Sequence, residues 1–283
     1  MTAKVSIRSA AFSYGNKEVW RDLNLEVRQG ETICLLGPNG CGKTTLLNCI
    51  HGDFTLQSGN ITIDGHEVKA MSFTEIARVM GYVFQEHSAP FPYSSLEVVR
   101  MGRAPHLGLF QVPSRKDTEL AWDIMEEMGI GHLADKPYTN ISGGERQLVL
   151  IARTLCQGPE IILFDEPTSH LDFKNQALVL QTISRLAAKG LTIIMTSHFP
   201  NHAWLLRSRI AMMDNNGFVA IGPAEEIMTE ENLSATYGLR VKVYQAKDGQ
   251  GTINFCSPEF VAPGDTSSPA ANLSAMGERA VND

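Results

Sequence analysis

A chain of 283 residues is long enough to bury one or two cores, and 43% hydrophobic with 19% charged residues is typical of a globular protein. A net charge of −7 argues against a nucleic-acid binder that depends on a broad basic surface. The five cysteines include no Cys-x-x-Cys pair, which favours reduced thiols in a cytoplasmic protein over a disulfide framework or a zinc site.

The first 85 residues predict several short strands and one helix. "KVSIRSAAFSY" and "LNLEVRQGETICLLG" have the alternating pattern of strands, with Gly30 at a turn between two of them. "KTTLLNCIHG" predicts a helix that ends at Gly52. "GNITIDGHEV" and "GYVFQ" predict two further strands.

The sequence pattern changes from about residue 87 to 150, where the apolar residues of "SSLEVVRMGR", "KDTELAWDIMEEMG" and "GGERQLVLIARTL" have helical periodicity. We interpret this part as a helical insertion within an α/β domain. "PEIILFDEP" and "LTIIMTSH" then predict buried parallel strands, joined by the helix "FKNQALVLQTISRLAAKG". Two hairpins are expected next, "RIAMMDNNGFVAIGP" and "VKVYQAKDGQGTINF", the second turning at 248–249. Residues 257–283 lack an apolar period and predict a flexible tail.

The strongest chemical signal is "GPNGCGKTT", residues 37–45, which fits the phosphate-loop pattern between a predicted strand and a predicted helix. Gly37, Gly40 and Gly42 allow the main chain to wrap closely around a phosphate, with the amides of 39–45 pointing inward. We expect Lys43 to reach the β- and γ-phosphates of a nucleotide and the Thr44 hydroxyl to bind Mg²⁺.

"IILFDEPTSHLD" places two carboxylates at the end of a buried strand, where open α/β sheets bind ligands. Asp165 suits a direct or water-bridged contact with Mg²⁺. Glu166, one residue further, points the other way and can act as a base on an attacking water. The alternative is a pair of surface carboxylates at a strand end.

A second anion-binding helix end is predicted at "ISGGERQ". Ser142, Gly143 and Gly144 leave the main-chain amides bare at the start of a helix, which favours binding of a phosphate. No lysine or threonine follows to hold a whole nucleotide, so this helix end has no evident ligand within one chain.

The motifs "GPNGCGKTT", "VFQE", "ISGGERQ", "IILFDEPTSHLD" and "MTSH" occur in this order, after a tyrosine in "FSYG". Over about residues 3 to 240 this set resembles the ATP-binding cassette family, the nucleotide-binding subunits of ABC transporters. The stretch at 141–145 is similar to the family signature Leu-Ser-Gly-Gly-Gln, with Ile141 and Glu145 at its two ends. The resemblance implies a P-loop cassette fold with a parallel-sheet core, an antiparallel β subdomain and a helical subdomain.

The resemblance also implies a homodimer that pairs head to tail, with two ATP molecules at the interface. The signature residues of one subunit would then bind the γ-phosphate on the phosphate loop of the other. The implied nucleotide contacts are Tyr14, Gly37, Pro38, Asn39, Gly40, Cys41, Gly42, Lys43, Thr44, Thr45, Ser142, Gly143 and Gly144. Catalysis would fall to Glu166, His198, Gln85 and Lys43, and Mg²⁺ would be held by Thr44, Gln85 and Asp165. Asp172 would face the other subunit.

Cys41 is expected to be a reactive thiol, since Lys43 and a helix N-terminus both lower a thiol pKa. We therefore expect a thiol reagent to modify Cys41 first and bound MgATP to protect it. The alternative is that this position needs a small residue and the sulfur is incidental.

Other users of the cassette fold fit less well. The stretch 45–141 lacks the coiled-coil heptads of DNA-repair relatives, and one phosphate loop with one signature differs from the paired cassettes of translation factors. No segment is apolar for long enough to span a bilayer, and "MTAKVSIRSA" lacks the apolar region of a signal peptide. We therefore expect the peripheral, ATP-hydrolysing subunit of a bacterial importer, at the cytoplasmic face of the inner membrane, with a non-transport ATPase as the alternative.

Within importers, "EVVRMGRAPHLGLF" and "GPAEEIMTEENLSATYG" are similar to the iron-siderophore, haem and cobalamin group. Expected partners are permease subunits and, indirectly, a substrate-binding protein, but no nucleic acid. The segment after Gln85 would form the docking groove for the permease, and the cargo would be an iron-siderophore, with haem, cobalamin or molybdate as alternatives. Expected boundaries are 3–240 for the ATPase domain, 87–150 for its helical subdomain and 241–256 for a C-terminal hairpin.

Overall fold

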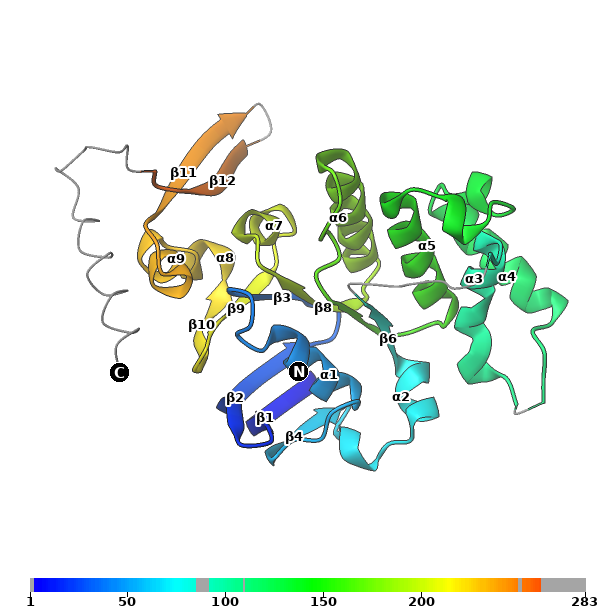
Figure 1. Cartoon of the computed structure of the whole chain (residues 1–283), viewed down its shortest axis with the longest axis horizontal. Helices are drawn as coiled ribbons and strands as arrows, with labels where there is room; N and C mark the ends of the chain where they lie inside the picture. Colours follow the sequence, from blue (N-terminus) through cyan, green and yellow to red (C-terminus); the bar gives the residue numbers. More distant parts are fainter. Residues whose placement is uncertain (1–2, 85–91, 109, 249–250, 261–283) are drawn as a thin grey trace.

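The computed structural model describes residues 3–84, 92–108, 110–248 and 251–260. Within these residues the strands form three sheets (Figure 1). The antiparallel sheet has the order β2-β1-β4-β5 and contains β1 (Ala3–Tyr14), β2 (Lys17–Arg28), β4 (Ser58–Ile63) and β5 (His66–Glu67). The predicted turn at Gly30 is present, because β2 ends just before it and β3 begins just after it.

The central sheet has the order β10-β9-β3-β8-β7-β6, and all its strands except β10 run parallel. Its strands are β3 (Thr32–Leu36), β6 (Met80–Val83), β7 (Ile161–Phe164), β8 (Thr192–Ser197), β9 (Arg209–Asp214) and β10 (Gly217–Pro223). The third sheet is the hairpin of β11 (Val241–Asp248) and β12 (Gly251–Pro258). β12 therefore runs two residues past the expected hairpin end at 256.

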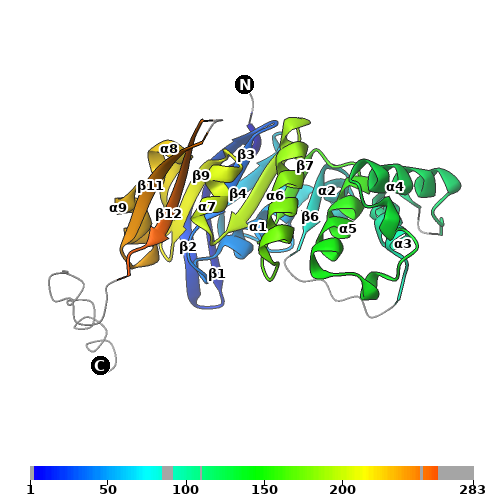
Figure 2. The same cartoon turned by 90° about the horizontal axis from the view of Figure 1, so that it is seen from above.

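Nine helices cover the described part of the chain: α1 (Lys43–His51), α2 (Phe73–Val79), α3 (Ser95–Arg100), α4 (Arg115–Glu127), α5 (Gly143–Cys156), α6 (Phe173–Ala188), α7 (Pro200–Leu205), α8 (Ala224–Ile227) and α9 (Glu230–Tyr237). Short 3₁₀ turns occupy Val68–Ala70, Met101–His106, Gly131–Leu133 and Tyr138–Asn140. In both views α3, α4 and α5 form a group at one end of the central sheet (Figures 1 and 2).

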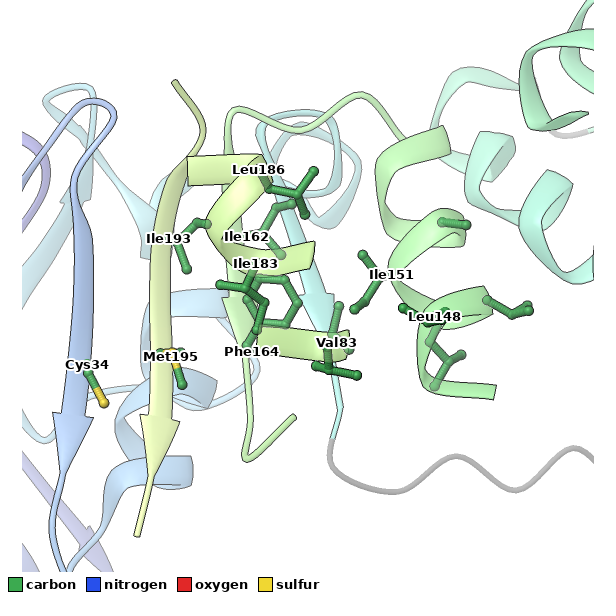
Figure 3. Packing of buried hydrophobic residues seen from close by; sticks show 14 of the residues in the cluster. Cys34, Val83, Leu148, Ile151, Ile162, Phe164, Ile183, Leu186, Ile193 and Met195 are labelled. Carbon is green, nitrogen blue, oxygen red and sulfur yellow. The ribbon is translucent and has the colours of Figure 1, made fainter. Parts of the chain in front are cut away.

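The central sheet is buried on both faces, which explains why its strands are almost wholly apolar. Side chains alternate along β7, so Ile161 and Leu163 belong to the core shared with the antiparallel sheet and α1. Ile162 and Phe164 belong to the opposite core, under α5 and α6. Figure 3 shows this second core, where side chains from β7, β8, α5 and α6 pack together around Phe164.

The sheet order decides where the chemical residues meet. β3 lies beside β8, and β8 lies beside β7, with all three strands parallel. Their carboxyl ends therefore share one edge of the sheet. The phosphate loop follows β3, the two carboxylates follow β7, and His198 follows β8. Three segments that are far apart in the sequence thus converge on one site.

Candidate nucleotide-binding site

The phosphate loop between β3 and α1 has the conformation that its glycines permit. Gly40 and Gly42 have φ of +84° and +95°, which side-chain-bearing residues rarely adopt. Gly37 is required for space, because a Cβ there would lie 2.2 Å from the carbonyl oxygen of Met213 in β9. α1 then begins at Lys43 and ends at Gly52, whose φ of +87° allows the expected C-cap.

Beside this loop is a cleft of about 780 Å³. Its lining includes Tyr14, Asn39, Gly40, Gly42, Lys43, Thr44, Thr45 and Glu166, which the sequence predicted, together with Lys17, Glu18, Val19 and Asn215, which it did not. Tyr14 is half-exposed at the rim, and its hydroxyl lies 3.2 Å from the Thr45 Oγ1. A half-exposed aromatic ring beside a phosphate loop offers a face on which a base can stack.

Lys43 is almost completely buried beneath the loop. Its Nζ donates hydrogen bonds of 2.9 Å to the carbonyl oxygens of Gly37 and Pro38 and lies 3.8 Å from Glu166 Oε1. The ammonium group is therefore held between the loop and the carboxylate. This position places a fixed positive charge where the loop amides would surround a phosphate.

Glu166 stands at the centre of the site. Its Oε2 lies 3.0 Å from His198 Nδ1, and its side chain is only 12% exposed. The main chain of Glu166 has φ +45°, a strained value for a residue with a side chain. Thr196 in β8 holds this conformation, because its Oγ1 accepts a hydrogen bond of 2.8 Å from the Glu166 amide. Strain of this kind is often found at functional positions.

Asp165 and Thr44 form the second polar group of the site. The Thr44 hydroxyl donates to Asp165 Oδ1 at 2.9 Å, and the Thr196 hydroxyl donates to the same oxygen at 2.7 Å. The Tyr82 hydroxyl in β6, which lies 3.0 Å from Asn48 Oδ1, also lies 3.4 Å from Asp165 Oδ2. The sequence analysis did not select Thr196 or Tyr82. Their only signal is their position in "MTSH" and "GYVFQ", next to residues that it did select.

The residues present fit a magnesium ion. Hydroxyl and carboxylate oxygens are the ligands Mg²⁺ prefers, and it binds through one or two of them together with phosphates and water. Thr44 and Asp165 supply such a pair beside the phosphate loop. Gln85, the third predicted ligand, lies outside the described residues. In the parts of the chain that the structure describes, no three His, Cys, Asp or Glu side chains gather to hold a metal ion.

The structure contradicts the expected reactivity of the Cys41 thiol. Its side chain is 1% exposed, and burial raises the pKa of its thiol, an effect that the charge of Lys43 offsets only in part. The sulfur points into the core below the loop, and Gly37 is its close neighbour. The expected reactivity is therefore wrong, and the alternative of a small residue that packs in the core is the better interpretation. All five cysteines are free.

The signature segment lies away from this cleft. α5 and α1 are separated in both views, and the residues that line the cleft come from 14–19, 39–45, 166 and 215 (Figures 1 and 2). Ser142 and Gly143 are exposed, whereas Gly144 is buried against α6. A Cβ at Gly144 would lie 2.2 Å from the side chain of Asn175. Gly144 thus allows α5 and α6 to approach closely.

Ser142 is also the N-cap of α5. Its Oγ accepts from the Glu145 amide and donates to Glu145 Oε2 at 2.7 Å, which makes a capping box. The Ser142 amide, which donates to Glu145 Oε2 at 2.8 Å, and then the Ser142 hydroxyl hold the pKa of the Glu145 carboxyl below its usual value. Asp172 has a similar local role, since its carboxylate caps α6 through the Asn175 amide at 2.8 Å.

A smaller cleft of about 160 Å³ lies between β6, α2 and α5. Phe84, half-exposed, and Arg153 are among the residues that line it. Phe84 is the last described residue before the expected docking segment, of which residues 85–91 lie outside the described residues. Across residues 3–84, 92–108, 110–248 and 251–260, none of the helices has both the length and the apolar character of a membrane span.

Comparison with known proteins agrees with this geometry. Residues 20–169 match the family model described as ABC transporter. The molybdate import ATP-binding protein MolC of Haemophilus influenzae is 34% identical over 87% of this chain and 93% of its own length. The ferric enterobactin transport ATP-binding protein FepC of Escherichia coli is 34% identical over 85% and 89%. A solved structure described as an inward-facing, metal-chelate type ABC transporter has 32% identity and a TM-score of 0.83, covering 92% of this chain and 98% of its own.

The chain belongs to the ABC transporter family and is an ATPase of that family, with the P-loop cassette fold.

Proposed function

We propose that this protein is the ATP-hydrolysing subunit of an ABC importer and that two copies bind two ATP molecules between them. The observation that carries the proposal is the cluster of Lys43, Glu166 and His198 at the carboxyl edge of the sheet, next to the phosphate loop. A strained carboxylate with a buried ammonium group and an imidazole each within 4 Å of it suits phosphoryl transfer to water.

In this proposal the loop amides and Lys43 bind the β- and γ-phosphates of ATP, and Tyr14 stacks on the adenine. Glu166 orients the attacking water and accepts its proton, and His198 holds the carboxylate and contacts the γ-phosphate. Thr44, Asp165 and Gln85 hold Mg²⁺, which neutralises charge on the phosphates. Ser142, Gly143 and Gly144 act on the ATP of the partner subunit. The exposure of Ser142 and Gly143 supports this role, and none of the three lines the cleft of its own chain.

The import role rests on the relatives. MolC and FepC are named for molybdate import and ferric enterobactin transport, and the similar solved structure for a metal chelate. We therefore propose a metal chelate as cargo, an iron-siderophore before haem, cobalamin or molybdate. The permease would dock at the cleft beside Phe84, at the cytoplasmic face of the inner membrane. We further propose 3–240 as the ATPase domain, 87–150 as its helical subdomain and 241–256 as a C-terminal hairpin.

Replacing Glu166 by Gln tests the hydrolytic assignment. The amide keeps the size of the side chain but cannot accept the proton of the water, so we expect turnover to fall by at least ~10²-fold. MgATP affinity, measured by calorimetry, should stay close to that of the wild type. Glu160→Gln is the matched control, because Glu160 is a half-exposed carboxylate that pairs with Lys4 just before β7, at the end of the strand away from Glu166. Near-normal hydrolysis by Glu166→Gln would remove Glu166 from the proposed mechanism.

The cargo needs a separate experiment. Copurification of the chain with its permease and substrate-binding protein, followed by uptake of labelled ferric siderophore, haem, cobalamin and molybdate into proteoliposomes, identifies the substrate. We expect uptake of the iron-siderophore in the presence of ATP and no uptake with Glu166→Gln. Uptake of another compound alone would replace the proposed cargo and leave the ATPase assignment unchanged.

A further inference from the structure

The main chain of His198 is held from outside the nucleotide site. The hydroxyl of Tyr237, at the end of α9, donates a hydrogen bond of 3.1 Å to the His198 carbonyl oxygen. The imidazole of His198 meanwhile lies 3.0 Å from Glu166. One residue is thus fixed at both ends, its side chain by the carboxylate of the site and its main chain by a residue 39 positions later in the sequence.

Tyr237 is well suited to hold a fixed position. Its ring packs against the core that also contains the β8 side chains. Burial raises the pKa of its hydroxyl well above the usual range for tyrosine, with smaller contributions from nearby thiols and from Glu166. The hydroxyl therefore remains protonated, and remains a donor, at neutral pH.

A second contact reaches the same segment three residues later. Asn201, in the first turn of α7, accepts a hydrogen bond of 2.8 Å from the Cys256 amide and donates one of 3.3 Å to the Cys256 carbonyl oxygen. The side-chain amide thus pairs with β12 in the manner of a peptide group in a sheet. The hairpin lies beside α7 in both views (Figures 1 and 2).

α9 and the hairpin are joined to each other, so the two contacts belong to one unit. Ser234 Oγ accepts a hydrogen bond of 2.9 Å from the Val241 amide. The Glu230 carboxylate accepts 3.0 Å from the Val243 amide and 3.1 Å from Lys242 Nζ. Glu230 therefore connects the first turn of α9 to the start of β11.

We propose that α9 and the β11–β12 hairpin position His198 for hydrolysis, with Tyr237 as the main positioning residue. The inference rests on the proposed role of His198 in turnover. A displacement of the His198 main chain moves the imidazole away from Glu166 and from the γ-phosphate, and small displacements of catalytic groups cost rate more than they cost binding. If α9 and the hairpin only stabilised the fold, substitutions in them would lower stability without changing kcat per folded molecule.

The test compares Tyr237→Phe with Tyr244→Phe in the full-length protein. Both variants lose one phenolic hydroxyl, but Tyr244 is half-exposed and stacks on Phe255 in the hairpin, so the control keeps its packing. We expect Tyr237→Phe to lower kcat about 3- to 10-fold, the value of one hydrogen bond, with MgATP affinity unchanged. Tyr244→Phe should match the wild type in both measurements.

A double-mutant cycle separates positioning from general structure. His198→Ala alone should lower kcat by ~10²-fold or more. If Tyr237 acts through His198, then His198→Ala with Tyr237→Phe should be no slower than His198→Ala alone. Asn201→Ala should give the same pattern, which keeps the test available if either tyrosine variant folds poorly.

The possible outcomes distinguish a failure of the positioning role from a failure of the proposed role of His198. Wild-type kcat in both Tyr237→Phe and Asn201→Ala would overturn the positioning role, as would a further loss when each is added to His198→Ala. Normal turnover by His198→Ala would instead overturn the proposed role of His198 itself. A loss in Tyr237→Phe that disappears in the His198→Ala background supports the inference.

Discussion

At the scale of single residues, Glu166 occupies a main-chain conformation that few side-chain-bearing residues adopt. Its φ of +45° is held by Thr196, which also donates to Asp165. One hydroxyl in β8 therefore sets the positions of both carboxylates that follow β7. Thr196 thus supports the site although it does not line the cleft.

His202, four residues after His198, predicts a pH dependence of stability. Burial lowers its pKa to about 4, and His198 adds to the lowering. Thr168 Oγ1 and Ser197 Oγ lie 3.3 and 3.4 Å from its Nδ1. Because the unfolded chain binds a proton near pH 6.5 and the folded protein does not, the unfolding free energy falls as the pH drops from about 6.5 to 4.

His202→Asn removes this titration. By pH 4 the wild type should have lost ~3 kcal/mol of unfolding free energy through His202, and the variant should lack this part of the pH slope. Urea unfolding at pH 7 and pH 4 measures the difference, and any general destabilisation by the substitution cancels in the slope. Equal pH slopes for the two proteins would show that folding does not lower the pKa of His202.

The positions of single residues in the site were predictable from sequence only where a motif fixes the local geometry. The loop pattern placed Lys43 and Thr44 at the cleft, and the family resemblance assigned Glu166 and His198 to one site, where the structure has them 3.0 Å apart. The prediction that the Cys41 thiol is reactive was wrong. It considered the neighbours of Cys41 in sequence and not the direction of its side chain, which packs into the core. Thr196 and Tyr82 were missed because their contacts join strands that are distant in sequence.

At the scale of elements, the helix that begins at the signature is the feature with the clearest consequence. Ser142 is exposed at the start of α5, and no residue of 141–145 lines the cleft. Ser142→Arg should therefore leave MgATP affinity of the single subunit largely intact. It should abolish turnover, because the longer side chain fills the space that the partner's γ-phosphate would occupy.

Ser114→Arg is the matched control, since Ser114 makes the same capping box at the start of α4. Both substitutions remove a cap worth ~1 kcal/mol, so both should lower thermal stability by similar amounts. Only Ser142→Arg should stop hydrolysis. Loss of MgATP affinity by Ser142→Arg, comparable to that of Lys43→Ala, would mean that the signature contacts the nucleotide of its own chain.

Most elements were predictable because their sequence patterns are local. The strand alternation in β1 and β4 and the periodicity of α4, α5 and α6 match the structure. The helices α2, α7, α8 and α9 were not predicted, because, unlike the equally short α3, they do not lie within a longer stretch of helical periodicity. Their positions depend on packing against sheets and on contacts such as that of Asn201 with β12.

At the scale of the whole molecule, two features of the proposal lie at opposite ends of the central sheet. The helical group of α3, α4 and α5 presents the signature, while α9 and the hairpin reach the segment after β8 (Figure 2). The nucleotide site lies between them, at the edge where β3, β7 and β8 end. In a head-to-tail pair, the signature of each copy would face the phosphate loop of the other.

The most direct test of this account is the mass of Glu166→Gln in solution, measured by light scattering after size exclusion with MgATP and with MgADP. Binding without hydrolysis should trap the pair, so we predict twice the 31.0 kDa of one chain with MgATP and a single chain with MgADP. Adding Ser142→Arg should return the MgATP sample to a single chain. A Glu166→Gln protein that binds MgATP by calorimetry yet keeps the mass of one chain would contradict the shared site.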